Sequence, residues 1–144
     1  MRVVEAFVSI LGKALDGTGT VVLVVEDEAM IRMTLVCELE DAGFVVIEAK
    51  NADVAMAMLT DRSDIVVVVT DVRMPGSIDG FGLAAWMREH AASVPIIITA
   101  GFAELPDIAA INPAIARIVA KPYRSQEVAV WVREVSSRAA TPPN

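Results

Sequence analysis

The sequence predicts a three-layer α/β fold, in which helices cover both faces of a parallel sheet. Five short aliphatic runs alternate with segments of helical periodicity, so strands and helices are expected to follow one another along the chain. Several of these runs are continuously apolar, which is typical of strands buried on both faces. The connections are short, which favours right-handed crossovers between adjacent parallel strands.

Five segments are expected to form the strands of this sheet. The first, third and fourth are continuous aliphatic runs and should be buried by helices on both sides. In chain order, the expected strands occupy residues 21–25, 44–49, 65–70, 95–99 and 116–120.

Helical patterns lie between the strands. Asn51 is a candidate N-cap for the second helix, and Pro106 and Pro113 restrict the fourth to a short segment. The fifth carries apolar residues at helical spacing. The expected helices are a first one through 31–39 that stops near Gly43, and four more at 52–59, 79–90, 103–112 and 125–138.

Length and composition favour one domain. The chain has 144 residues and 55% hydrophobic residues, enough for one substantial core. We expect this domain at 20–138, a disordered tail at 139–144 and an N-terminal extension at 1–19 that is helical or a frayed leader. No length remains for an effector domain, so a stand-alone domain is expected.

Charge and cysteine content narrow the classes of function. The net charge of −7 argues against nucleic-acid binding and favours protein partners and bound cations. The sequence has one cysteine, Cys37, so an intrachain disulfide is excluded and the cytoplasm is the favoured compartment. Cys37 itself is interpreted as packing in the core. Met30, Met33, Met56 and Met58 are interpreted as packing too. Without a run of about 20 apolar residues, no membrane span is expected.

Polar residues follow four of the expected strands, where parallel sheets bind ligands. Glu26 and Asp27 follow the first strand and Asp71 the third, while Thr99 and Lys121 end or follow the fourth and fifth. Asp27 taken alone could equally cap the next helix. Three converging carboxylates would resist ionisation unless a cation held them, and Mg²⁺ is the simplest candidate.

This pattern suits phosphoryl transfer onto Asp71. A carboxylate beside a divalent ion can attack a phosphoryl group in line without a general base. Lys121 would neutralise one phosphoryl oxygen, and the Thr99 hydroxyl and the Ala100 amide would contact others.

Four ordered motifs resemble those of response-regulator receiver domains, the phosphoacceptor modules of two-component systems. The resemblance covers about 20–138, and each motif ends a strand. The motifs are Val-Leu-Val-Val-Glu-Asp-Glu at 22–28, Thr-Asp-Val-Arg-Met-Pro at 70–75 with Asp-Gly at 79–80, Ile-Ile-Ile-Thr-Ala at 96–100 and Ala-Lys-Pro-Tyr at 120–123.

The resemblance implies a flavodoxin-like (βα)5 fold with strand order 2-1-3-4-5. It implies a phosphohistidine donor on a sensor histidine kinase or a histidine phosphotransfer protein. Because Thr99 and Lys121 begin the loops after the fourth and fifth strands, output by protein–protein interaction is expected through the face formed by 100–135. A homodimer also stays open, with a helix in residues 1–15 as its candidate contact. The implied roles are phosphoacceptor and metal ligand for Asp71, and direct metal ligand for Asp27 with Glu26 assisting. The Arg73 carbonyl is implied as a third metal ligand, and Thr99 and Lys121 as phosphate contacts.

The chain departs from the family pattern at three places. Ile118 replaces the aromatic residue that commonly turns inward on phosphorylation. Residues 76–78 enlarge the loop beside the site, and Arg73 is expected to change the lifetime of the phosphoryl group.

Two other functions stay open. An aspartate-nucleophile phosphohydrolase would share the acids, lysine and threonine, but normally needs a carboxylate two residues after the nucleophile, where Arg73 stands. A receiver-like module that binds partners without phosphorylation is the other. We expect a domain that promotes only its own phosphorylation and dephosphorylation, not an enzyme acting on other substrates.

Overall fold

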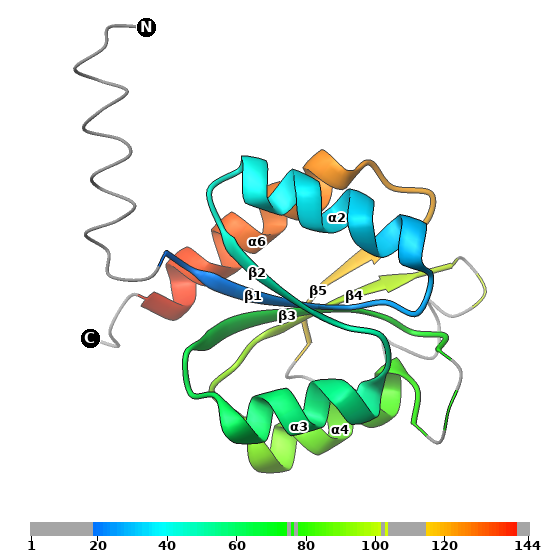
Figure 1. The fold of residues 1–144 in the computed structure, drawn as a ribbon, viewed down its shortest axis with the longest axis vertical. Coiled ribbons are helices and arrows are strands. Elements are labelled where there is room, and N and C mark those ends of the chain that lie inside the picture. Colours follow the sequence, from blue (N-terminus) through cyan, green and yellow to red (C-terminus); the bar gives the residue numbers. More distant parts are fainter. Residues whose placement is uncertain (1–18, 75, 77, 102, 104–114, 141–144) are drawn as a thin grey trace, which may run out of the picture.

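A computed structural model describes residues 19–74, 76, 78–101, 103 and 115–140, and it confirms the α/β fold with a parallel sheet (Figure 1). The strands pair in the order β2-β1-β3-β4-β5, each pair parallel. Each strand lies within one residue of its expected bounds. They are β1 Val21–Val25, β2 Val45–Ala49, β3 Ile65–Asp71, β4 Ile96–Ala100 and β5 Ile115–Ala120.

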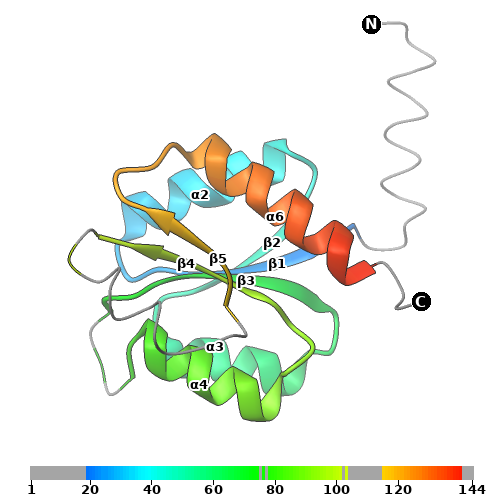
Figure 2. The same cartoon turned by 180° about the vertical axis from the view of Figure 1, so that it is seen from behind.

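Four described helices form the outer layers. Helices α2 (Ala29–Asp41) and α6 (Ser125–Ala140) cover one face of the sheet, and α3 (Ala52–Asp61) and α4 (Gly80–His90) cover the other (Figures 1 and 2). Residues 104–112 of the expected fourth helix and residues 1–18 of the N-terminal extension lie outside the described residues. None of the helices in the described part of the chain has the length and apolar character to cross a membrane.

The ends of three helices are informative. Asn51 caps α3 as expected, its side chain accepting a hydrogen bond of 2.8 Å from the Val54 amide. Asp79 likewise accepts from the Gly82 amide, so α4 begins one residue later than expected. Helix α6 continues to Ala140, so the first two residues of the expected disordered tail are helical, and 141–144 lie outside the described residues.

The core consists of two layers, because successive strand residues point to opposite faces of the sheet. On β1, Leu23 packs on the α3/α4 side, and Val22 and Val24 pack on the α2/α6 side. All five residues of β1 and of β4 are buried, which explains the unbroken hydrophobicity of β1 and of residues 96–98 in β4.

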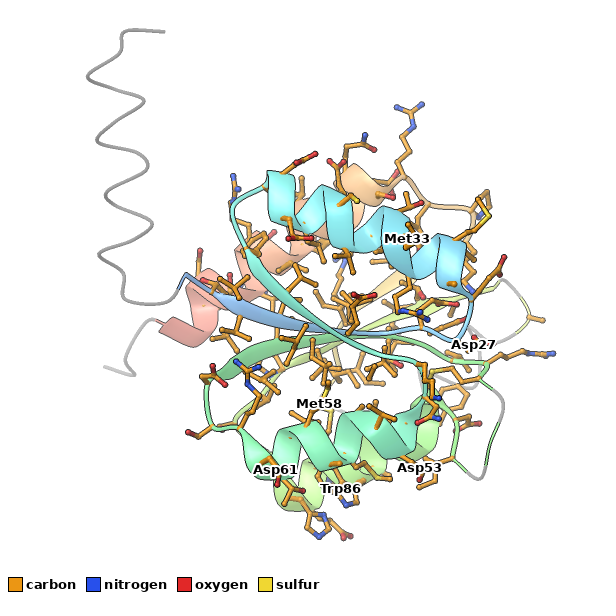
Figure 3. All side chains as sticks on the ribbon, in the orientation of Figure 1. Asp27, Met33, Asp53, Met58, Asp61 and Trp86 are labelled. Atoms are coloured by element: carbon orange, nitrogen blue, oxygen red, sulfur yellow. The ribbon has the colours of Figure 1, made fainter. Side chains whose placement is uncertain are left out.

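Two expectations about side-chain packing are wrong. Cys37 is exposed on α2, not part of the core. Met30 and Met33 are 78% and 61% exposed, because both lie on the solvent side of α2. Met56 and Met58 do pack against the core, and Figure 3 shows Met58 on α3 and Met33 on α2.

Candidate functional site

The candidate site lies at the carboxyl ends of β1, β3, β4 and β5. Because side chains alternate along a strand, a residue two positions after a side chain of the α2/α6 layer points to the same face. Val24, Val69, Ile97 and Val119 all belong to that layer. The same alternation therefore directs Glu26, Asp71, Thr99 and Lys121 to one side of the sheet edge.

Three carboxylates meet at this edge. Glu26, Asp27 and Asp71 each offer an oxygen, and these oxygens lie within 4.8 Å of one another. Glu26 and Asp71 are buried, with 3% and 7% exposure, and Asp27 is exposed. Figure 3 shows Asp27 where β1 leads into α2. The acidic cluster expected from the sequence is therefore formed, and it has one side open to solvent.

Lys121 contacts the acidic cluster directly. Its Nζ lies 2.9 Å from Oδ1 of Asp71, and its amide donates to the Ala100 carbonyl over 2.8 Å. The second bond continues the pairing of β4 with β5 by one residue. The position of the ammonium thus follows from the register of the sheet.

Thr99 lies beside Asp71 in the sheet. The two residues are register partners of β4 and β3, and the Thr99 carbonyl accepts from the Val72 amide over 3.2 Å. Thr99 and Ala100 are 1% and 0% exposed. Both residues therefore lie at the expected strand end, next to Asp71, whose phosphoryl group they were expected to contact.

Burial shifts the protonation of the cluster. The pKa of Glu26 is raised from 4.5 to about 7, first because burial penalises the charged carboxylate, and further because Asp71 and Asp27 repel it. A hydrogen bond from the Glu28 amide to Glu26 Oε1 and the charge of Lys121 act in the opposite direction. At Glu26, burial and the neighbouring carboxylates thus outweigh the hydrogen bond and the charge of Lys121.

Asp27 does not cap α2. The N-cap position is Glu28, whose side chain makes no capping hydrogen bond. The capping alternative for Asp27 is wrong, and its carboxylate lies with Glu26 and Asp71 instead.

A glycine sets how closely α4 approaches the site. A Cβ atom at Gly80 would lie 2.2 Å from the Asp71 carbonyl oxygen and 2.9 Å from Cα of Val72. The Gly80 amide donates to the Val72 carbonyl over 2.8 Å. The start of α4 thus packs directly on the backbone that carries Asp71. In the sequence, Asp79-Gly80 was recognised only as part of a motif, without this packing role.

Two hollows adjoin the cluster. One of ≈ 470 Å³ is lined by Asp27, Arg73, Met74 and Asp79, so exposed Arg73 borders the acidic site. The other, of ≈ 580 Å³ and mostly apolar, lies between α2 and the β5–α6 connection, with Lys121 in its wall. Its other lining residues are Met30, Ile31, Thr34, Leu35, Pro122, Tyr123 and Ser125.

The fold and site together define a class of protein, a single-sheet module with an acidic strand-end cluster and one lysine. Residues 22–133 match the family model of the response regulator receiver domain. The chain belongs to the response-regulator receiver family, as its motifs predicted.

Individual relatives support this assignment. The chain is 33% identical over 122 residues to the transcriptional regulatory protein ResD of Bacillus subtilis. The aligned segment covers 84% of this chain and 50% of ResD. The chain spans about half the length of the curated relatives it matches.

Solved structures agree. The response regulator receiver protein from Sinorhizobium medicae is 29% identical with a TM-score of 0.75, covering 84% of this chain and 97% of that one. A receiver domain protein from Clostridium thermocellum has a TM-score of 0.77 at 24% identity, covering 83% and 95%, and supports the fold alone.

Proposed function

We propose that this chain is a phosphoacceptor of a two-component pathway, in which Asp71 receives a phosphoryl group from a phosphohistidine. The observation that carries the proposal is the acidic cluster, with three carboxylate oxygens within 4.8 Å and Lys121 on Asp71. Membership of the receiver family supports it. The receiver unit would span 20–138 and work in the cytoplasm, where phosphohistidine donors act on such domains.

The donor set fits Mg²⁺. Oxygen ligands from one or two carboxylates are what this ion takes from proteins, and its remaining positions go to water and phosphate oxygens. Asp27 and Asp71 would hold it directly, Glu26 would assist, and the Arg73 carbonyl would be a further ligand. When bound, the ion would neutralise the carboxylates and draw the donor phosphate to the site.

The protein's own residues then do three things. A carboxylate oxygen of Asp71 attacks phosphorus, and the bond from phosphorus to the donor histidine nitrogen breaks as the new P–O bond forms. Lys121 exchanges its contact with Asp71 Oδ1 for one with a phosphoryl oxygen. Thr99 donates its hydroxyl, and Ala100 its amide, to the other phosphoryl oxygens. Positioning and charge complementarity carry the step, without a general base.

The donor protein would dock beside this site. The apolar hollow between α2 and the β5–α6 connection includes Lys121, and Met30 at its rim is 78% exposed. A histidine-bearing helical partner that covers the hollow would bring its imidazole to the open side of the cluster. Apolar contacts would supply affinity, and the acidic site would receive the phosphate.

The signal would leave through the face formed by 100–135. Thr99 and Lys121 would move toward the phosphoryl group, which adds about −1.5 to −2 charge. Ile118 is half-buried, packs against the core on the α3/α4 side and pairs with Ile98. It has no ring to turn inward, so the ends of β4 and β5 would transmit the change by a population shift, to a downstream protein or a second copy of the chain.

The test is incubation with Mg²⁺ and acetyl phosphate, followed by intact mass. Wild type should gain the mass of one phosphoryl group, and Asp71→Asn should gain none. Asp61→Asn is the matched control, because Asp61 is an exposed aspartate at the far end of α3 (Figure 3). Wild type that stays unmodified, with beryllofluoride also without effect, would favour the module that only binds partners.

The hydrolase alternative makes a different prediction. It requires repeated turnover of phosphomonoesters, and the exposed cation Arg73 occupies the place of its acid/base carboxylate. We expect single phosphorylation followed by slow release of phosphate, since the domain acts only on its own aspartyl phosphate. Steady release of phosphate from p-nitrophenyl phosphate would favour the hydrolase instead.

A further inference from the structure

Arg32 joins three elements next to the acidic cluster. It lies in the first turns of α2, and its Nη1 donates to the carbonyl oxygen of Glu26 over 2.8 Å. Its Nε donates to Oε1 of Glu48, near the end of β2, over 3.0 Å. The guanidinium therefore ties the exits of β1 and β2 to the start of α2.

The carbonyl that Arg32 holds belongs to the peptide between Glu26 and Asp27. The orientation of this peptide decides where the Asp27 side chain leaves the backbone. The Glu26 amide is fixed on the other side by the Ala49 carbonyl, over 3.1 Å. Together the two bonds fix Glu26 from both directions, and Asp27, which is exposed, takes its place from them.

The usual support for this loop is weak. Glu28, the N-cap residue of α2, makes no side-chain capping bond, and the first turn of α2 has no acidic residue. The bond from the Glu28 amide to Glu26 Oε1 is 3.2 Å long. At 2.8 Å, the Arg32 bond to the Glu26 carbonyl is the shorter of these two side-chain bonds to residues 26–28, and the second Arg32 donor fixes the planar guanidinium on Glu48.

We propose that Arg32 is a positioning residue for the divalent-cation site, and this inference rests on the proposed function. It holds the Glu26–Asp27 peptide so that the Asp27 carboxylate stays within reach of Asp71. Loss of the guanidinium weakens cation binding and leaves the phosphoryl-transfer step intact once the cation is bound. Groups that orient metal ligands typically contribute about 10- to 100-fold to metal affinity.

The experiment measures Mg²⁺ binding by isothermal titration calorimetry without any phosphodonor, and the rate of phosphorylation by acetyl phosphate across Mg²⁺ concentrations. Arg32→Met should raise the Kd for Mg²⁺ about tenfold. Its rate at saturating Mg²⁺ should return to the wild-type value, which separates binding from chemistry. Arg32→Lys should fall between, because one ammonium cannot reproduce the fixed two-acceptor fork.

Glu48 supplies the control and a second variant. Glu48→Gln keeps an acceptor oxygen for Arg32, so its Kd should stay within about twofold of wild type. Glu48→Ala removes that anchor and should raise the Kd by less than Arg32→Met does. If Arg32→Met does not fold, Arg32→Lys and Glu48→Ala carry the test.

Three results decide between the explanations. A merely structural Arg32 would lower the urea midpoint in EDTA and leave the Kd for Mg²⁺ unchanged, which would overturn the inference. A rate that saturating Mg²⁺ cannot restore would overturn it too. If wild type itself binds no Mg²⁺, the proposed function fails with it, and the wild-type titration alone shows this.

Discussion

Lys121 places its ammonium 2.9 Å from Oδ1 of Asp71, one of the three carboxylates of the acidic cluster. Glu26 and Asp27 add two more carboxyl groups to this cluster, so the single charge of Lys121 does not balance all three. A divalent cation and the lysine would both be attracted to the same carboxylate. On the proposed function, their relation would change from competition before phosphorylation to cooperation on the phosphoryl oxygens afterwards.

Lys121→Gln should therefore have opposite effects on binding and on chemistry. The Kd for Mg²⁺ should fall, because a repelling positive charge is removed. The rate of phosphorylation by acetyl phosphate at saturating Mg²⁺ should drop at least about tenfold, because a phosphoryl oxygen loses its cation. Calorimetry and intact mass measure the two quantities. Lys50→Gln is the control, because it removes an exposed lysine and changes the net charge by the same amount. A higher Kd for Mg²⁺ in Lys121→Gln than in wild type would contradict the competition.

The raised pKa of Glu26 predicts a pH dependence of stability in the metal-free protein. The folded state keeps the Glu26 proton up to about pH 7, and the unfolded state loses it near 4.5. The unfolded state thus binds fewer protons in this window, so this group makes the free energy of unfolding fall as the pH rises. The contribution is at most about 1.4 kcal/mol per pH unit.

Urea unfolding in EDTA checks this against Glu26→Gln. The variant should lack this part of the slope and should be more stable than wild type above pH 7, where wild type carries the buried charge. Exposed Glu127→Gln should keep the wild-type slope. Parallel curves for wild type and Glu26→Gln would show that Glu26 ionises normally in the folded protein.

Gly80→Ala should destabilise the protein, although alanine is the better helix former. Helix propensity alone would give a gain of at most about 1 kcal/mol, the helix-interior value, since Gly80 is the first residue of α4. The new Cβ would instead meet the Asp71 carbonyl oxygen at 2.2 Å, and relieving such overpacking typically costs about 1–3 kcal/mol. The urea midpoint measures the sign. Ala85→Gly, at an exposed position of α4, reports propensity without the clash, and a stabilised Gly80→Ala would refute the close approach.

Much of this architecture could be predicted from the sequence, because hydrophobic runs and strand-end residues carry it. The run Val21–Val25 indicated a strand buried on both faces, and the two core layers confirm this. The convergence of Glu26, Asp27 and Asp71 followed from the parallel sheet, since the carboxyl ends of parallel strands share an edge.

Other features depend on helix orientation and three-dimensional contacts, which a residue pattern does not specify. Cys37 and Met33 are apolar by type, but α2 is buried chiefly through Leu35 and Leu39, and its other side faces solvent. Arg32 could not be recognised, because its partners include a backbone carbonyl and the remote Glu48. Arg32 follows Glu26 by six residues, and this spacing belongs to no motif by which such a contact could be recognised in a sequence.

The exposed methionine at the rim of the apolar hollow gives a final prediction about the donor protein. Met30→Gln keeps helix propensity but replaces an apolar contact beside Lys121 with a polar one. Phosphorylation by a histidine kinase, chosen by profiling a panel of purified kinases against wild type, should slow about tenfold. Phosphorylation by acetyl phosphate should be unchanged, because a small donor needs no docking surface.

The control is Val130→Gln, which changes an exposed apolar residue of α6 outside the lining of the hollow and should leave both rates as in wild type. Equal slowing with both donors would place the effect in the site itself, and an unchanged kinase rate would remove the hollow from the docking surface.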